Sequence, residues 1–140
     1  MVIDHIYAPG EVDGSDGLLG IIIRELQGTS PPGGLFHTPR DLTQQVGYIK
    51  HDKGHPIPRH IHKAADRFIR NNVEVILVRK GKMRVDFYTS RQQLVCSRTV
   101  GEEDVVILVA GGHGFEALED LELFEVRQGP YLGEQDKERF

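Results

Sequence analysis

Short segments that are β-branched or alternate between apolar and polar residues run through most of the chain, and they limit its possible folds most strongly. Alternation with a period of two is typical of strands, and no segment carries an apolar stripe of helical period over three turns. So many short strands in 140 residues predict an all-β sandwich or barrel with little helix. The strands are expected at 20–26, 44–50, 59–63, 73–79, 82–88, 93–100, 104–110 and 121–127.

The length and the turn residues indicate one domain, 1–140, with many turns. Its 16 glycines and 7 prolines favour turns over long helices. We expect an N-terminal strand and a Pro/Gly-rich loop over 1–43, a barrel core over about 44–127, and a charged tail over 128–140. The tail is expected to be solvated, with a clamp on a partner subunit as the alternative. RKGK at 79–82 predicts a tight hairpin in which Gly81 takes a positive φ.

Charge and cysteine content argue against several classes of protein. The formal net charge of −4 disfavours a nucleic-acid-binding protein, and no apolar run approaches the roughly 20 residues that span a bilayer. The first residues lack the basic and apolar regions of a signal peptide. One cysteine, Cys96, excludes an internal disulfide and is expected to be a small core residue. We therefore expect a cytoplasmic protein that contacts neither nucleic acid nor membrane.

The hexapeptide PRHIHK, residues 58–63, places His60 and His62 one residue apart. On a strand, this spacing puts both imidazoles on one face, roughly 6.5–7 Å apart along the backbone. They could then converge on one ion. A single strand cannot complete such a site, so further ligands have to come from neighbouring strands.

Glu74 and His113 are suitable partners for this pair. Glu74 opens the run VEVILVR on a face that is otherwise apolar, and a carboxylate is costly to bury there unless a cation meets it. His113 follows an apolar run within GGHGF, where glycines allow a close backbone approach. Three histidines and one glutamate suit a divalent transition metal such as iron, manganese, nickel, zinc or cobalt. They would leave one or two positions open for water or substrate.

The spacing of these residues resembles the two conserved motifs of the cupin superfamily. The stretch from Gly54 through His60 and His62 to Glu74 and Gly81 resembles the first motif, and the run from Gly101 to His113 resembles the second. The resemblance implies a double-stranded β-helix, or jelly roll, with His60, His62, Glu74 and His113 as metal ligands at one mouth of the barrel. It also implies a homodimer. The chain departs from the motif by placing eleven residues between His62 and Glu74, where three or four are usual.

These observations favour a cupin protein that binds a divalent metal and a small oxygenated ligand, and they leave its activity open. As an enzyme it would be a metal-dependent isomerase or epimerase, or an oxygenase. One alternative is a non-enzymatic module that binds or senses a sugar or carboxylate. Another is a metal-independent isomerase of nucleotide sugars with a histidine base.

Basic and aromatic side chains near the motifs have two possible roles each. Four basic residues could draw an anionic substrate to the pocket or simply be solvated, namely Arg59, Lys63, Arg67 and Arg70. Four aromatic residues are expected to fill the core or line the pocket, namely Tyr48, Phe68, Phe87 and Phe115. Tyr88 is expected outside or at a subunit contact if Phe87 lies in the core.

Overall fold

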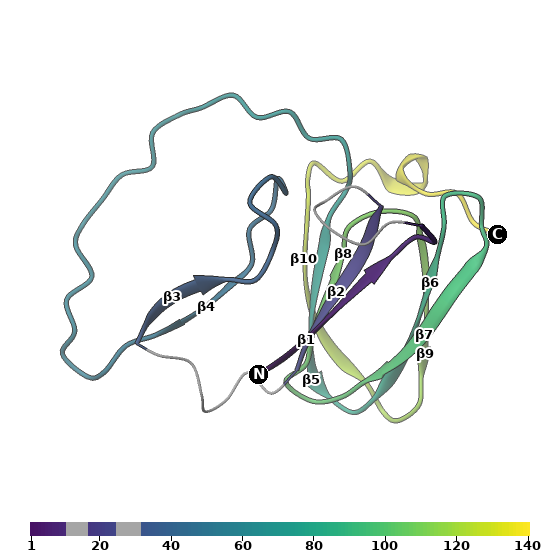
Figure 1. The fold of residues 1–140 in the computed structure, drawn as a ribbon, viewed down its shortest axis with the longest axis horizontal. Coiled ribbons are helices and arrows are strands. Elements are labelled where there is room, and N and C mark those ends of the chain that lie inside the picture. The colour runs from purple at the N-terminus through teal and green to yellow at the C-terminus, as the bar shows by residue number, and fades with distance from the viewer. Residues whose placement is uncertain (11–16, 25–31) are drawn as a thin grey trace.

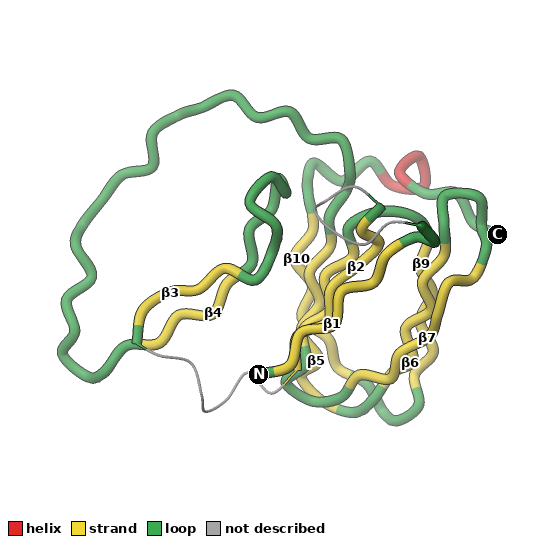
Figure 2. The backbone as a smooth tube through the Cα atoms, viewed as in Figure 1, coloured by secondary structure: helices red, strands yellow, loops and turns green. Residues whose placement is uncertain are grey.

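The chain folds almost entirely into antiparallel β-structure. The computed structural model describes residues 1–10, 17–24 and 32–140. Residues 25 and 26 of the first predicted strand, and 27–31 of the Pro/Gly-rich loop, lie outside this range. The described strands are β1 (Val2–Tyr7), β2 (Leu18–Arg24), β3 (Gly33–Phe36), β4 (Gly47–Lys50), β5 (Glu74–Lys80), β6 (Met83–Tyr88), β7 (Leu94–Val100), β8 (Val105–Leu108), β9 (Gly112–Ala117) and β10 (Glu122–Arg127). The short 3₁₀ helix η1 (Gly133–Asp136) is the one helical element in the described residues (Figure 2).

Two larger sheets form the body of the protein. The first has five strands in the order β1-β2-β8-β5-β10, and the second has three in the order β7-β6-β9. Figure 1 shows the two sheets facing each other, with β3 and β4 apart from both as a two-stranded hairpin. Every pairing is antiparallel, so the expected all-β class with little helix is confirmed.

The main core lies between these two sheets and follows the alternation of the sequence. Ile76 and Val78 of β5 and Val85 and Phe87 of β6 are all buried in it. The Phe87 ring lies directly over Gly20, where a Cβ atom would come within 2.4 Å of the ring. Cys96 is partly buried and packs against the same cluster.

Strand β2 is buried on both faces, which explains its nearly unbroken apolar sequence. Ile22 belongs to the core between the sheets, whereas Ile21 and Ile23 belong to a second cluster on the outer face. Leu42, from the segment between β3 and β4, packs into that second cluster. The tip of the β3–β4 hairpin is therefore fixed to the body.

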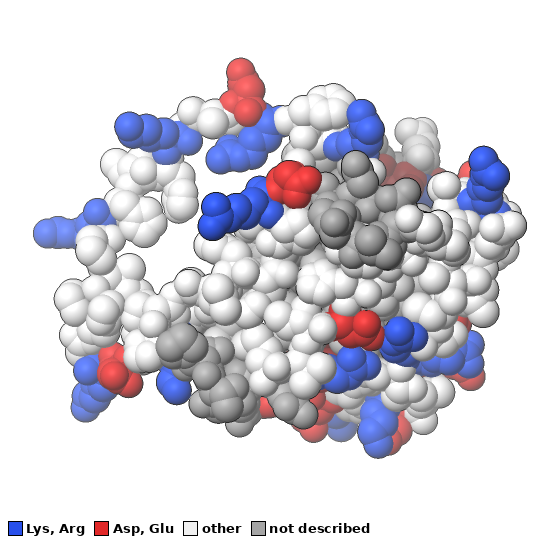
Figure 3. Space-filling view, viewed as in Figure 1, with Lys and Arg blue, Asp and Glu red and all other residues white. Residues whose placement is uncertain are grey.

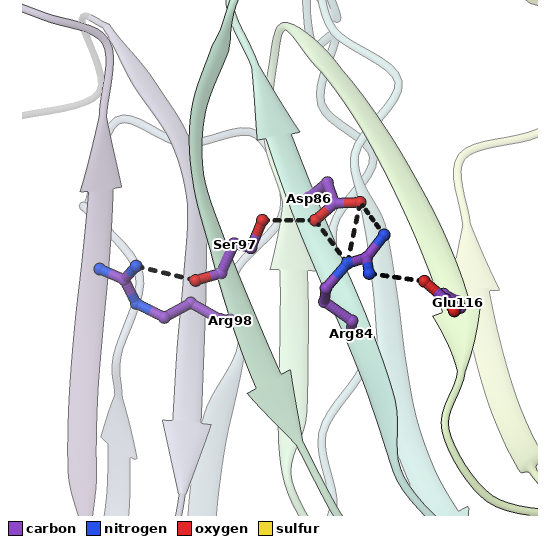
Figure 4. A network of polar contacts seen from close by, with 5 residues as sticks. All are labelled: Arg84, Asp86, Ser97, Arg98 and Glu116. Atoms are coloured by element: carbon purple, nitrogen blue, oxygen red, sulfur yellow. Dashed lines mark hydrogen bonds and ion pairs between the residues drawn. The ribbon is translucent and has the colours of Figure 1, made fainter.

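Polar side chains cover the outer face of the small sheet (Figure 4). Arg84 Nε donates to Asp86 at 3.0 Å, and Ser97 Oγ donates to the same carboxylate at 2.5 Å. Arg84 also pairs with Glu116 of β9. These contacts join all three strands, because Asp86, Ser97 and Glu116 stand on β6, β7 and β9.

The turn at Gly81 differs from the prediction. Gly81 has a φ of +82°, as expected, but β5 and β6 belong to different sheets and do not pair. The predicted hairpin is wrong, and the turn is a corner between the two sheets. A Cβ atom on Gly81 would lie 2.1 Å from the carbonyl oxygen of Asp120, so this corner packs tightly against the β9–β10 connection.

Other predictions of strands need correction as well. The segment 59–63 is not a strand, because Pro56 and Pro58 lack amide donors and no described strand lies beside it. It belongs to a long extended loop, residues 51–72, that runs from the base of the β3–β4 hairpin to β5 (Figures 1 and 2). Strands β1, β3 and β9 were not among the predicted segments. β3 and β9 contain two glycines each, and VIDHIY of β1 does not alternate strictly between apolar and polar residues.

Candidate functional site

Glu74 is a buried carboxylate at the first position of β5. It is 8% exposed and lies in register with Leu108 of β8 and Arg127 of β10. Arg127 Nη2 donates a hydrogen bond to Glu74 Oε1, and this contact raises the pKa of the Arg127 guanidinium. The cation that the buried carboxylate requires is therefore supplied by the chain itself.

His113 approaches the same carboxylate from the opposite sheet. It stands on β9, and its Nε2 atom lies 3.5 Å from Glu74 Oε2. Burial lowers the pKa of His113, while the charge of Glu74 acts in the opposite direction. An imidazole that is neutral at pH 7 can offer a lone pair to an ion or a proton.

A cavity of about 810 Å³ is lined by Glu74, His113 and Arg127, among other residues. Its walls carry four basic side chains, Arg70, Arg127, Lys137 and Arg139, and three acidic ones, Glu74, Asp136 and Glu138. The Nε atom of Arg127 is buried without a hydrogen-bond partner among the residues that the structure describes, and it lies 3.5 Å from Glu125 Oε1. A polar ligand in the cavity would therefore meet both signs of charge.

The C-terminal segment closes one side of this cavity. The ring of Phe140 lies edge-on to the ring of Tyr88, with centroids 5.2 Å apart. A Cβ atom on Gly112 would come within 2.9 Å of the Phe140 ring, so the ring lies close to the backbone of β9. Gln92 also donates to Glu138 at 3.4 Å. The tail was expected to be solvated; its residues are exposed except for the half-buried Gly133, and its last residues also line the pocket.

His60 and His62 lie elsewhere, on the exposed long loop. Their ring centroids are 5.1 Å apart, and His60 Nδ1 lies 3.0 Å from the carbonyl oxygen of Pro58. Within the described part of the chain, no three His, Cys, Asp or Glu side chains are grouped closely enough to hold a metal ion. The structure thus brings Glu74 and His113 together but not His60 and His62, and the four-ligand site stays a prediction.

The basic and aromatic residues singled out in the sequence lie partly on the long loop and partly in the pocket or the core. Of the four basic residues proposed as a gate, Arg70 lines the cavity, and all four are exposed. Phe87 is in the core and Phe115 lines the pocket, as expected. Phe68 is 80% exposed on the long loop, so the prediction that it fills the core is wrong.

Arg127 and Phe140 of the pocket were missed from the sequence. Tyr88, expected outside or at a subunit contact, also lines the pocket. Arg127 could have been sought as the partner of Glu74, since it is a cation at the end of an apolar strand. The antiparallel pairing of β5 with β10 that brings the two side chains together leaves no local signal in the sequence.

No family model, curated protein or solved structure matches this chain. None of the described residues form a helix long and apolar enough to cross a membrane.

Proposed function

We propose that this chain is a cupin-type jelly roll that binds a divalent transition metal and a small anionic, oxygenated ligand in the cavity between its two sheets. Two facing antiparallel sheets support the jelly roll, as does the corner at Gly81 where the chain passes from one sheet to the other. The metal part depends on a single observation, the 3.5 Å approach of Glu74 Oε2 to His113 Nε2.

This distance fits two ligands of one ion. Oxygen and nitrogen ligands lie about 2.1 Å from such an ion, so two of them are about 3.0–3.5 Å apart at angles between octahedral and tetrahedral. A neutral imidazole and a carboxylate are also suitable donors for iron, manganese, nickel, zinc or cobalt. The pair supplies half of the predicted ligand set, and His60 and His62 would complete it.

Two basic side chains in the cavity wall support an anionic ligand. Arg70 lines the cavity from the end of the long loop and Lys137 lines it from the C-terminal segment, whereas Arg127 and Arg139 are paired with Glu74 and Glu134. A bound ion would polarise a carbonyl or carboxylate oxygen as a Lewis acid, or activate water or dioxygen. These properties suit an isomerase, an epimerase or an oxygenase. The basic side chains would hold a carboxylate or phosphate group of the ligand.

A metal-free site is the second candidate, and the Arg127–Glu74 ion pair favours it. Arg127 already neutralises the buried carboxylate, so no ion is needed to stabilise Glu74. His113, held neutral by burial, could then accept a proton from a bound sugar or simply donate a hydrogen bond to it. This candidate predicts that chelators leave ligand binding and any activity unchanged.

Calorimetric titration of the chelator-treated protein with Zn²⁺, Mn²⁺, Co²⁺ and Ni²⁺, and anaerobically with Fe²⁺, tests the proposal. We expect one site per chain, with affinity reduced at least tenfold in Glu74→Gln, His113→Ala and the pair His60→Ala with His62→Ala. The matched control is His51→Ala with His55→Ala, because these two histidines stack on each other in the same loop. The metal proposal fails if the wild type binds none of these ions. It also fails if the control weakens binding as much as the site variants do.

A further inference from the structure

The long loop, residues 51–72, is exposed along its whole length, although its last residues line cavities of its own chain. Every one of its residues is exposed, including the apolar Ile57 and Ile61, which are 66% and 92% exposed. Holding so long a segment in one extended path costs conformational entropy that internal contacts would normally repay. The loop therefore has the properties of a segment that packs on another surface.

The hairpin from which the loop starts has the same character. It contains only β3 and β4, and a two-stranded hairpin is marginally stable alone. Leu35, Phe36 and Ile49 on it are 55–63% exposed. Apolar side chains of this size, grouped on a separate hairpin, indicate a binding surface.

A surface that could receive the hairpin and the long loop lies along β10, next to the pocket. Among the described strands β10 pairs with β5 only, so its other edge is open. Leu123, Phe124 and Val126 on this strand are 39%, 62% and 46% exposed. An open edge with exposed apolar side chains is a template for another chain. The strand ends at Arg127, which contacts Glu74, so a segment docked here would reach the mouth of the pocket.

The charges of the two surfaces are complementary. The long loop carries five basic and two acidic residues, and Figure 3 shows lysine and arginine side chains spaced along it. The segment 122–140, which contains β10 and the C-terminal wall of the pocket, carries five acidic and three basic residues. Opposite charges on matching surfaces favour association and fix its orientation.

The way in which the hairpin is attached indicates that the loop packs on a second copy of the chain rather than on its own body. Leu42 and Thr38, at the tip of the hairpin, are buried, and β3, β4 and the start of the long loop extend away from the sheets (Figure 1). If the loop closed over its own pocket, the apolar side chains of the hairpin would stay uncovered. A two-fold dimer can cover hairpin, loop and β10 edge together, because each surface is present on both copies.

We propose that two copies of this chain exchange their long loops, and that each loop lies along the partner's β10 and brings His60 and His62 to the partner's Glu74 and the partner's His113. The metal part of this inference rests on the proposed function. The exchange of loops does not.

Sedimentation velocity in the presence of a chelator tests the dimer independently of metal. We expect wild type to have twice the monomer mass of 15.8 kDa at micromolar concentration, and Phe124→Glu to be a monomer. Leu94→Glu is the matched control, because Leu94 is 59% exposed on β7, away from β10, and this variant should stay dimeric. A wild-type monomer, or a Phe124→Glu dimer, would overturn the proposal.

Mixed dimers then decide whether the loop acts on its own chain or on the partner. Chains carrying Glu74→Gln and chains carrying His60→Ala with His62→Ala are given different tags, mixed, and purified as mixed dimers. If the loops are exchanged, the intact His60 and His62 of one chain reach the partner's intact Glu74, so each mixed dimer has one complete site. We then expect half of the wild-type metal content in the mixed dimer, whereas neither homodimer has a complete site. Loops that serve their own chain leave no complete site, so a mixed dimer without metal overturns the exchange.

A cross-linking experiment tests the exchange of loops even if the wild type binds no metal. That result would refute the proposed function but not the exchange. Chains with Ile61→Cys are mixed with chains with Val126→Cys, both in a Cys96→Ser background, and oxidised. We expect a covalent dimer in the mixture. Its absence, with both variants dimeric by sedimentation, would show that the loop does not lie on the partner's β10.

Discussion

Glu74 Oε2 lies 3.5 Å from His113 Nε2, although the two residues belong to opposite sheets. Glu74 starts β5 in the five-stranded sheet, and His113 stands on β9 in the three-stranded sheet. Their contact spans the space between the sheets at the open end of the core. The other carboxylate oxygen is taken by Arg127, so one buried anion links three strands.

Replacement of Arg127 should destabilise the protein through Glu74. Arg127→Leu leaves a nearly buried carboxylate without its cation, and we expect the free energy of unfolding to fall by about 2–4 kcal/mol. The double variant with Glu74→Gln should lose less than Arg127→Leu alone. Urea denaturation measures both. Arg139→Leu removes an exposed ion pair with Glu134 and should cost less than about 1 kcal/mol. Equal losses for Arg127→Leu and the control would contradict the role of the buried pair.

Asp86 should make stability depend on acidic pH. Hydrogen bonds from Arg84 and then Ser97 lower the pKa of its carboxyl group in the folded state. A lowered pKa stabilises the fold above the unfolded-state value of about 3.9, and this contribution is lost as pH falls through the folded-state pKa. Asp86→Asn should therefore cost about 1–2 kcal/mol at pH 7 and less at acidic pH.

Denaturation of wild type and Asp86→Asn at neutral and strongly acidic pH measures this difference. Asp52→Asn, on the exposed loop, is the control and should change stability little at either pH. A deficit in Asp86→Asn that stays the same throughout would show that the charge of Asp86 does not stabilise the fold.

Gly81→Ala should disrupt the corner between the two sheets. The new Cβ would meet the Asp120 carbonyl oxygen at 2.1 Å, and the φ of +82° disfavours any side chain. Since backbone rather than a flexible side chain is in the way, we expect a loss of about 3 kcal/mol or more, measured by thermal or urea unfolding. Gly101→Ala meets its nearest neighbour at 3.7 Å and should cost less than about 1 kcal/mol. Similar stabilities for the two variants would contradict the tight corner.

Gly20 and Phe87 should show strong energetic coupling. A Cβ on Gly20 would lie 2.4 Å from the Phe87 ring and 2.9 Å from the Ile107 carbonyl oxygen, so Gly20→Ala should cost about 2–3 kcal/mol. Phe87→Leu removes the nearer obstacle. In a double-mutant cycle, the loss in the double variant should be smaller than the sum of the two single losses by about 1 kcal/mol or more. Additive losses would show that the ring does not fill the space over Gly20.

The alternation of apolar residues was enough to place most strands. The segments 73–79, 82–88, 93–100 and 121–127 all became strands, with shifts of one residue at their ends. In β5 the buried side chains alternate with more exposed ones, so burial of one face produces the period of two in the sequence. The burial of Phe87 followed from the same pattern. The sequence also showed that Glu74 would need a cation, since its strand face is otherwise apolar.

Tertiary structure alone decided which residues meet. Arg127 reaches Glu74 through strand pairing, His113 reaches it across the two sheets, and Phe140 reaches Tyr88 by the return of the C-terminal segment. Such contacts join residues far apart in the chain and depend on sheet order, which local alternation does not encode. The path of the long loop is of the same kind: without periodicity or paired strands, its sequence marks His60 and His62 as notable but does not determine where they lie.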